Sequence, residues 1–198
     1  MPKLILLRHG QSIWNEQNIF TGWADVELSA KGIEEARQAA ILLRFYEIDF
    51  AFTSVLKRAI HTLEIVLEGR SPQIPVFKSA LLNERNYGDL QGLYKAETEH
   101  KYGLEQVLAW RRSFSTAPPN GESLKDTLER VLPYYLLEIE PRLKLNQNIL
   151  IVAHGNSLRA LMMHLENISE TNIETINIAT CTPRVYDFTV RLKLLGVK

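Results

Sequence analysis

Two histidines follow short apolar segments of the chain in the same way. Residues 4–7 (LILL) are followed by RHG, which contains His9, and residues 149–153 (ILIVA) are followed by HGN, which begins at His154. All-apolar runs of this length are typical of strands buried on both faces of a sheet. Ligands of open α/β sheets bind outside the carboxyl ends of the strands. If the two strands are neighbours, we expect the imidazoles to meet at a ligand site, where a neutral imidazole is a competent nucleophile.

Basic side chains near these histidines indicate that the ligand is an anion. Arg8 adjoins His9, and Arg58 falls early in a predicted helix, on the side away from its apolar stripe. Arginine can bind phosphate through two parallel hydrogen bonds and does not lose its proton. Attack on a phosphate ester also needs a group that protonates the leaving oxygen, and Glu84, just after a predicted strand, is a candidate. A second cationic group is expected from Lys95, Arg111 and Arg112.

Each of these residues also has a simpler interpretation. A histidine at the end of a strand is more often a hydrogen-bonded structural residue, and an isolated basic residue is more often a solvated surface charge. Glu84 taken alone is typical of a surface glutamate paired with an arginine. A zinc site is disfavoured, because the sequence has no His-x-x-x-His, no cysteine pair and no Asp-x-Asp.

The apolar pattern predicts strands alternating with helices, which is typical of an α/β fold with a mostly parallel or mixed sheet. Strands are expected at residues 4–7, 49–53, 76–81, 148–153 and within 184–192. Helices are expected from Ser29 to about Tyr46, after an N-cap at Ser54, over 95–102 and 104–114, after a capping box at Ser123 and Asp126, and around 158–165. Pro133 should kink or break the helix that follows Ser123. A loop is expected over residues 115–121 (STAPPNG).

The composition narrows the class of protein. A chain of 198 residues with 45% hydrophobic residues is expected to form a single domain, residues 1–198. Its 23 Lys and Arg balance its 23 Asp and Glu, and a general nucleic-acid binder would show a basic excess. The longest apolar runs have five residues, against about 20 for a membrane span. One cysteine, Cys181, allows no internal disulfide, so we expect a cytoplasmic protein.

Longer motifs resemble those of one family. The opening LLRHGQSIWNEQNIFTGWADVELSAKG, and FTGW within it, is similar to the start of the cofactor-dependent phosphoglycerate mutases of the histidine phosphatase superfamily. Further similar segments are TSVLKRAIHTL, LNERNYGDLQGLYKAET, WRRSF, GESLKDTLERVLPYY and ILIVAHGNSLRAL. Together they cover about residues 4–188. The resemblance implies a phosphoglycerate mutase-like three-layer α/β sandwich, with a mostly parallel central sheet flanked by helices.

The resemblance also implies roles for individual residues. His9 would be the nucleophile that becomes a phosphohistidine, and Glu84 would exchange a proton with the substrate hydroxyl. The transferred phosphoryl group would be surrounded by Arg8, Arg58 and His154. The phosphate cradle would be lined by Ser12 and Asn15 and by the backbone around Gly10, Gly22 and Gly155. The substrate carboxylate or its second phosphate would be held by Thr21, Tyr87, Lys95, Arg111, Arg112 and Asn156.

The reaction implied is the interconversion of 3-phosphoglycerate and 2-phosphoglycerate, a step of glycolysis and gluconeogenesis. In the family, 2,3-bisphosphoglycerate primes the histidine and no metal takes part. The partners implied are small phosphoglycerates, with no nucleic acid and no membrane, and a homodimer is left open.

Two other functions share the same residues. A histidine phosphatase would hydrolyse small phosphate esters through the same phosphohistidine and differ at the substrate end of the pocket. A silent phosphate-binding module is disfavoured, because His9, His154, Arg8, Arg58 and Glu84 are all present. Two departures from the family keep the phosphatase open: only ten residues separate Arg112 from Ser123, where many members have a longer insertion, and the sequence ends at Lys198, where many members continue into a long polar tail. Cys181 stands where glycine is common, and its simplest interpretation is a buried small thiol.

Overall fold

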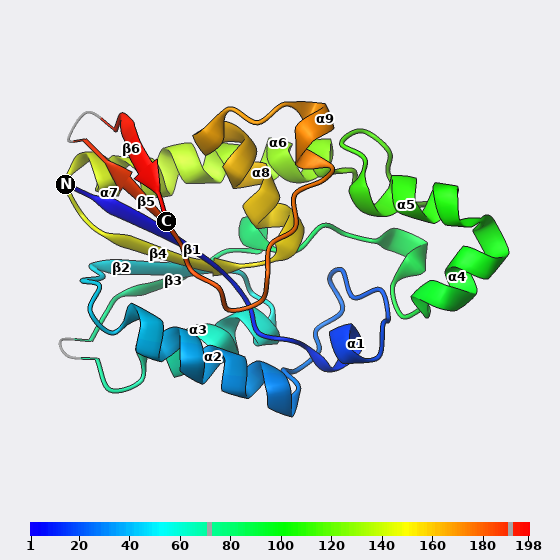
Figure 1. Ribbon diagram of the computed structural model, residues 1–198, viewed down its shortest axis with the longest axis horizontal. Coiled ribbons are helices and arrows are strands. Elements are labelled where there is room, and N and C mark those ends of the chain that lie inside the picture. The colour runs from blue at the N-terminus through cyan, green and yellow to red at the C-terminus, as the bar shows by residue number, and fades with distance from the viewer. Residues whose placement is uncertain (71–72, 190–191) are drawn as a thin grey trace.

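A six-stranded mixed sheet forms the centre of the computed structural model, which describes residues 1–70, 73–189 and 192–198. The strand order is β3-β2-β4-β1-β5-β6 (Figure 1). The strands are β1 (Lys3–Arg8), β2 (Phe50–Thr53), β3 (Val76–Lys78), β4 (Ile149–Ala153), β5 (Arg184–Phe188) and β6 (Leu194–Val197). Strands β1 to β4 pair in parallel, whereas β5 and β6 are antiparallel. The expected α/β class is confirmed, as is the mostly parallel sheet.

Helices cover both faces of this sheet (Figure 1). One layer holds α2 (Ala30–Leu43) and α3 (Lys57–Leu67). The other holds α6 (Leu124–Tyr134), α7 (Glu140–Lys144), α8 (Gly155–Glu166) and α9 (Glu170–Ile173). Three helices lie beyond the carboxyl ends of the parallel strands: α1 (Ile13–Glu16), α4 (Lys95–Tyr102) and α5 (Leu104–Arg112). Among the described residues, no helix is long and apolar enough to cross a bilayer.

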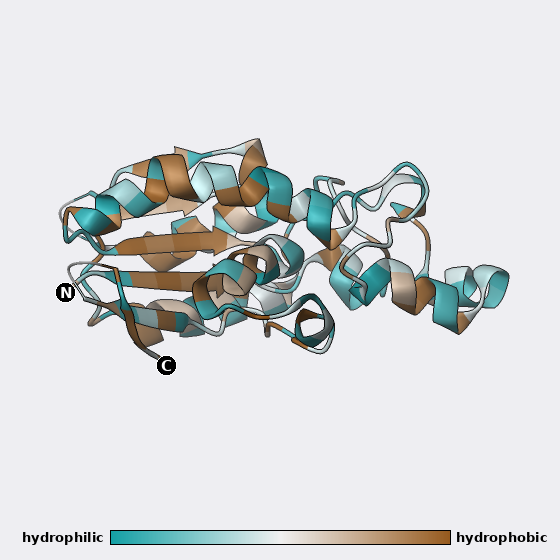
Figure 2. Ribbon diagram, turned by 90° about the horizontal axis from the view of Figure 1, so that it is seen from above, coloured by the Kyte–Doolittle hydropathy of each residue, from teal (hydrophilic) through white to brown (hydrophobic). Residues whose placement is uncertain are grey.

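Alternation along the central strands produces two cores, one in each layer. Leu4 and Leu6 of β1 pack with α6 and α8, whereas Ile5 and Leu7 pack with α2 and α3. The strands are therefore apolar at every central position, and Figure 2 shows them as continuous hydrophobic ribbons between the helices. The carboxyl edge of this sandwich faces α4 and α5.

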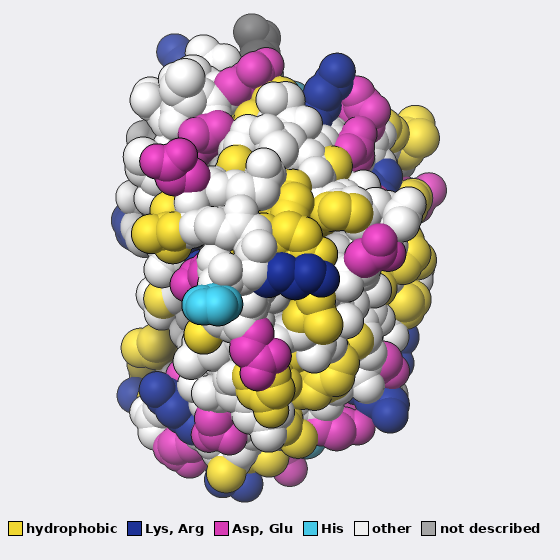
Figure 3. Space-filling model, turned by 90° about the vertical axis from the view of Figure 1, so that its right-hand side faces the viewer, with side chains coloured by type: hydrophobic (Ala, Val, Ile, Leu, Met, Phe, Trp, Pro, Cys, Tyr) yellow, Lys and Arg dark blue, Asp and Glu magenta, His cyan; other side chains and the backbone are white. Residues whose placement is uncertain are grey.

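The far end of the molecule, formed by α4 and α5, exposes several hydrophobic side chains. Figure 3 faces this end and shows hydrophobic side chains among acidic, basic and histidine side chains. The exposed hydrophobic residues there are Tyr94, Tyr102, Leu104 and Leu108. Glycine at position 103, with φ +85°, separates the two helices. These helices are thus held mainly by their inner faces, which carry Thr98, Val107 and Trp110.

Several predicted boundaries differ from the structure. The strand expected at residues 76–81 ends at Lys78, and a 3-10 turn, Ala80–Leu82, follows it. Helix α2 ends at Leu43 and α5 at Arg112, each shorter than predicted. Strands are present at 184–188 and 194–197, and residues 190–191 of the predicted segment lie outside the described residues. The expected loop at 115–121 is confirmed.

One local prediction was wrong, and another is met only in part. Ser54 does not cap α3, whose N-cap is Leu56 with no side-chain cap. The regular α-helix does end just after Pro133, at Tyr134, but the chain stays helical through a π-turn, Tyr135–Ile139, before α7. Proline removes one N–H donor from the helix, and a π-turn is a local change of hydrogen-bond register that keeps the segment helical.

The capping box at the start of α6 is present as predicted. Ser123 Oγ accepts from the backbone N–H of Asp126, and Asp126 Oδ2 accepts from the backbone N–H and the hydroxyl of Ser123. The bonds from Ser123 lower the pKa of Asp126. We therefore expect Ser123→Ala to reduce the free energy of unfolding by about 1 kcal/mol in urea denaturation at neutral pH.

The difference in the free energy of unfolding between the wild-type chain and Ser123→Ala should become smaller in acid. Because the folded pKa of Asp126 is lowered, its stabilising contribution is present above its ordinary value and is lost as the pH falls through the folded pKa. The control is Ser115→Ala, an exposed serine of the 115–121 loop, which should change the free energy by less than about 0.5 kcal/mol. Equal losses in the two variants would contradict the capping role.

Candidate active site

The two strand-end histidines meet at the carboxyl edge of the sheet. Strands β1 and β4 are parallel neighbours, with Arg8 opposite Ala153, so the residue that follows each strand lies at the same level. The ring centroids of His9 and His154 are 4.9 Å apart in an edge-to-face arrangement. Both side chains are buried, at 2% and 0% exposure. Parallel pairing thus turns two separate sequence motifs into one histidine pair.

The hydrogen bonds of His9 identify which ring nitrogen is free to react. Its Nδ1 lies 2.6 Å from the carbonyl oxygen of Gly10, which can only accept, so Nδ1 carries the proton. Its Nε2 accepts a hydrogen bond from Nε of Arg58 at 3.3 Å. Burial lowers the pKa of His9 well below its ordinary value, and the charges of Arg58 and Arg8 lower it further. His9 is therefore a neutral imidazole at pH 7, with the lone pair of Nε2 facing Arg58.

Arg58 is fixed in the first turn of α3 by the loop that carries the FTGW motif. Its Nη1 donates to the carbonyl of Ala24 at 2.9 Å and its Nη2 to that of Gly22 at 2.7 Å. Burial lowers the pKa of Arg58 to about 10, so it remains charged at neutral pH. Gly22 has φ +53°, and a Cβ there would lie 2.2 Å from Oε1 of Gln91. The position therefore needs glycine, which explains part of the motif.

Arg8 lies between His9 and the segment that returns from α9 to β5. Its Nη1 donates to the carbonyl of Ile178 at 2.7 Å. Its backbone carbonyl accepts from the N–H of Cys181 at 2.9 Å. Nε of Arg8 is buried and has no partner among the described residues. This donor and the hydroxyl of Thr21, also buried and unpartnered in the described part of the chain, are available to a bound anion.

Ser54, which the sequence suggested only as a helix cap, contacts His154. Its Oγ lies 2.7 Å from Nε2 of His154 and also accepts from the backbone N–H of Leu56 at 3.2 Å. The local signal was available, because Ser54 directly follows β2 as the histidines follow β1 and β4. What was missing is the pairing of β2 with β4, which brings residues 100 positions apart together.

The carboxylate of Glu84 points into the same pocket rather than pairing with an arginine. Its Oε1 accepts from the backbone N–H groups of Asn156 at 2.9 Å and of Arg85 at 2.8 Å. Asn156 is in the first turn of α8, directly after His154 and Gly155. Two backbone donors therefore hold one carboxyl oxygen, while Glu84 as a whole lines the pocket.

The pocket brings together most, but not all, of the predicted site residues. Those that line it are Arg8, His9, Asn15, Thr21, Gly22, Arg58, Glu84, Tyr87, Lys95, Arg111, Arg112, Gly155 and Asn156. His154 is packed behind His9 and does not line it. Ser12 does not line it either: its fully buried hydroxyl caps α1 by accepting from the N–H of Asn15 at 3.2 Å. Arg159, Asn177 and Ile178 line the pocket and were not predicted.

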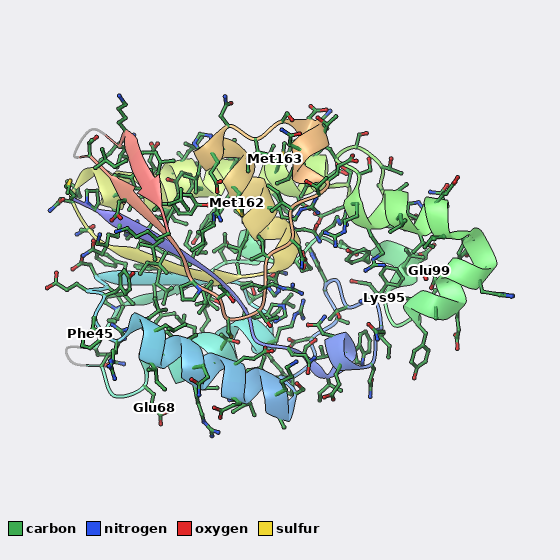
Figure 4. All side chains as sticks on the ribbon, in the orientation of Figure 1. Phe45, Glu68, Lys95, Glu99, Met162 and Met163 are labelled. Carbon is green, nitrogen blue, oxygen red and sulfur yellow. The ribbon has the colours of Figure 1, made fainter. Side chains whose placement is uncertain are left out.

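The end of the pocket away from His9 is formed by α4 and α5. Lys95 begins α4, and Glu99, one turn further on, forms an ion pair with Arg111 at 3.4 Å (Figure 4). Burial lowers the pKa of Lys95, and the charges of Arg111 and Arg8 lower it further. Arg112 donates to the carbonyl of Ile176 at 3.4 Å. A second group of cations therefore lies opposite the first, as the sequence predicted.

The charges of the lining favour an anion with two charged ends. Arg8 and Arg58 lie beside His9, and Lys95, Arg111 and Arg112 lie at the far end, whereas Glu84 is the acidic residue of the lining. Water-excluded cations bind anionic groups more strongly than exposed ones do. Within the described residues, no group of three or more His, Cys, Asp or Glu is arranged to hold a metal ion.

This fold and site define a class of protein. The chain belongs to the histidine phosphatase superfamily (branch 1), whose family model matches residues 4–193. A curated relative from Cytophaga hutchinsonii, named 2,3-bisphosphoglycerate-dependent phosphoglycerate mutase, is 59% identical over 100% of this chain and 92% of its own length. A relative from Bacteroides thetaiotaomicron with the same enzyme name, numbered 2, is 47% identical over 98% of this chain and 90% of its own length.

A solved structure extends the comparison to phosphatases. It is described as a putative alpha-ribazole-5'-P phosphatase from Escherichia coli and superposes with a TM-score of 0.83 at 28% identity. The match covers 98% of this chain and 94% of that one. The sandwich fold is therefore common to relatives with mutase and with phosphatase names.

The burial of two neutral histidines makes stability depend on pH. Both pKa values are lowered well below 6.5, so below that pH the unfolded chain binds protons that the folded chain does not. We expect the free energy of unfolding to fall as the pH drops below 6.5, by up to about 1.4 kcal/mol per pH unit for each histidine. Urea denaturation from about pH 7.5 to about pH 5.5 measures this slope.

Two variants assign the slope to the site. His154→Gln should reduce it by the share of one histidine. His100→Gln, at an exposed position of α4, is the control and should leave it unchanged. A slope near zero in the wild-type chain would mean that both buried imidazoles keep their ordinary affinity for protons.

Proposed function

We propose that this chain interconverts 3-phosphoglycerate and 2-phosphoglycerate through a phosphohistidine on His9, with 2,3-bisphosphoglycerate as intermediate. The observation that carries the proposal is the unprotonated Nε2 of His9, which faces Arg58 in a pocket with a second cationic end. The curated relatives at 59% and 47% identity carry the name of this enzyme. The reaction belongs to glycolysis and gluconeogenesis.

His9 takes up and gives back the phosphoryl group. Its Nε2 lone pair attacks phosphorus, the bond between phosphorus and the ester oxygen breaks, and that oxygen leaves as a hydroxyl. Arg8 and Arg58 offset the charge of the transferring oxygens, the first through its free Nε. We assign neutral His154, which packs against His9, to the same phosphoryl group as a hydrogen-bonding group rather than as a charge: Ser54 fixes its ring, and its Nδ1 has no partner among the described residues.

Glu84 supplies and removes the proton. When a phosphoryl group leaves a substrate oxygen for His9, that oxygen needs a proton, and Glu84 is the carboxyl group in the pocket. In the return step the same carboxylate takes the proton from the hydroxyl that attacks the phosphohistidine. The backbone bonds to its Oε1 fix the carboxylate and leave its Oε2 towards Gly155.

The remaining pocket residues bind the substrate in this proposal. Asn15, Gly22 and Gly155 line the phosphate end, and Ser12 contributes by holding Asn15 in place. The substrate carboxylate or second phosphate is bound by Thr21, Tyr87, Lys95, Arg111, Arg112 and Asn156. The two cationic ends fit 2,3-bisphosphoglycerate, which supplies the phosphoryl group that primes His9. We propose that no metal takes part.

The reaction itself is the first test. 2-Phosphoglycerate is measured from 3-phosphoglycerate with EDTA present, with and without 2,3-bisphosphoglycerate, and released phosphate is followed in parallel. Conversion that needs the bisphosphate and tolerates EDTA supports the proposal. Phosphate release without isomerisation would replace it by the alternative, a histidine phosphatase acting on small phosphate esters.

The phosphatase alternative has support of its own. A solved structure with a phosphatase description has the same fold with a TM-score of 0.83. Hydrolysis would use the same phosphohistidine, with water in place of the substrate hydroxyl. At 28% identity that structure is far more distant than the mutase relatives, so the mutase is the better supported function.

Removing the nucleophile should abolish turnover. His9→Ala should reduce both mutase and phosphatase activity by at least about 10⁴-fold, because no phosphohistidine can form. Binding of 3-phosphoglycerate, measured by calorimetry, should persist because the substrate end is untouched. Turnover at the wild-type rate in this variant would rule out the role of His9.

Removing the proton donor should slow chemistry more than binding. Glu84→Gln keeps the size and one acceptor oxygen of the side chain but cannot exchange a proton. We expect kcat to fall by about 10²- to 10⁴-fold with a change in KM of less than about fivefold. Glu129→Gln, which removes an exposed carboxylate that pairs with Lys125 outside the pocket lining, is the matched control. Equal losses in both variants would contradict the assignment.

The proposal also covers partners and place. We propose small phosphoglycerates as ligands, no nucleic acid or membrane as partner, and action in the cytoplasm. The zero formal net charge supports the absence of a nucleic-acid role. The choice between monomer and homodimer is left open, and light scattering of the purified chain decides it.

A further inference from the structure

Arg159 is a buried cation of the pocket wall that the proposed reaction does not use. It lies in the second turn of α8, is 3% exposed and lines the pocket. Its hydrogen-bond acceptors are all neutral: Oδ1 of Asn156 at 2.9 Å, the carbonyl of Ile173 at 2.5 Å and the carbonyl of Arg112 at 3.3 Å. A buried charge without a carboxylate partner is costly, so a function that repays the cost is expected.

The three acceptors belong to three different walls of the pocket. Asn156 is in the first turn of α8, and Arg112 is the last residue of α5. Ile173 ends α9 and leads into the segment that carries Asn177 and Ile178, which also line the pocket. One guanidinium therefore joins the walls at the end where the substrate carboxylate would lie.

Arg85 is a second buried arginine at the end of α5, and it binds the carbonyl one residue before the carbonyl that Arg159 binds. It is fully buried, and its Nη2 donates to the carbonyl of Arg111 at 2.6 Å and to the hydroxyl of Tyr87 at 3.1 Å. The last carbonyls of a helix lack partners within the helix, and cations near that end are favoured. Arg85 and Arg159 therefore bind successive carbonyls at the end of α5, under the two side chains that face the substrate.

Arg159 keeps its charge inside the protein. Burial, together with the nearby charges of Arg85 and Arg112, lowers the pKa of Arg159 to about 10, so it remains protonated at neutral pH. An anion bound in the pocket would offset this accumulation of positive charge. The arrangement thus orients the far end of the pocket and prepares it for a second negative group.

We propose that Arg159 is a positioning residue for the substrate end of the pocket, which orients Arg112 and Asn156 and so makes a phosphoglycerate bind more tightly than inorganic phosphate. The inference rests on the proposed function, because it assigns the far end of the pocket to the glycerate part of the substrate. A merely structural arginine would stabilise the fold without changing this preference.

Arg159→Met removes the charge and the hydrogen bonds of the side chain but keeps a side chain of similar length. Calorimetric binding of 3-phosphoglycerate should weaken about tenfold, while binding of inorganic phosphate near His9 should change by less than about twofold. In the mutase assay, KM for 3-phosphoglycerate should rise about tenfold and kcat should change by less than about threefold. Arg159→Lys keeps the charge but not the planar donors, so its affinity for 3-phosphoglycerate should lie between those of the wild-type chain and Arg159→Met. If Arg159→Met does not fold, the same comparison is made with Arg159→Lys.

Arg70→Met is the matched control. Arg70 likewise donates to two backbone carbonyls at the end of a helix, those of Leu43 and Tyr46, but lies outside the pocket lining. The Arg70→Met variant should have a lower melting temperature and unchanged binding constants for 3-phosphoglycerate and inorganic phosphate. Equal weakening of phosphate and 3-phosphoglycerate by the Arg159 variants, or no weakening of either, would overturn the inference.

The two proposals can fail separately. If the wild-type chain bound 3-phosphoglycerate without isomerising it, the proposed function would fail, and the binding comparison would still decide the role of Arg159. If the wild-type chain isomerised 3-phosphoglycerate and the Arg159 variants kept its KM, only the further inference would fail.

Discussion

The parallel pairing of β1 with β4 is the constraint on which the rest of the site depends. It fixes the relative height of two strands, so that the residues after them, His9 and His154, meet edge to face. The pairing is itself a consequence of apolar side chains at every central position, which need a helical layer on each side. The burial that stabilises the sheet is also the largest cause of the lowered pKa of both imidazoles, and the charges of Arg58 and Arg8 act in the same direction. Packing and reactivity are therefore linked at this edge of the sheet.

Around this pair the protein places more positive charge than it neutralises. Arg58 is held by carbonyl oxygens, and so are Arg85 and Arg159, rather than by carboxylates. Carbonyl dipoles orient a guanidinium without cancelling its charge, which leaves its field available to a ligand. Glu84 is held in the complementary way, by backbone N–H groups. The backbone thus acts as the counterpart of most charged groups in the pocket, and the side-chain charges remain for the substrate.

The sequence predicted those features that depend on adjacent residues. The apolar runs before His9 and His154 identified the two central strands, and the spacing of Ser123 and Asp126 identified a helix start. Features set by distant contacts were missed. Ser54 has the sequence signature of a cap, and only the β2–β4 pairing brings it to His154. Arg159 lies within an amphipathic helix, where a charged residue is normally expected to face solvent, and only the packing of α5 and α9 against α8 buries it.

The antiparallel direction of β5 has a consequence for how this pocket can change. To pair antiparallel with β1, the chain must enter β5 at the edge where β1 ends, so the segment from α9 has to pass over the mouth of the pocket. Arg8 ties this segment down through Ile178, and Cys181 follows it with φ +51°, a conformation that glycine adopts without strain. Insertions in this return segment would therefore lengthen the rim of the pocket without disturbing the sheet. Proteins with this fold could acquire different ligand preferences by this route, because the packing of the sheet and its helices would stay the same.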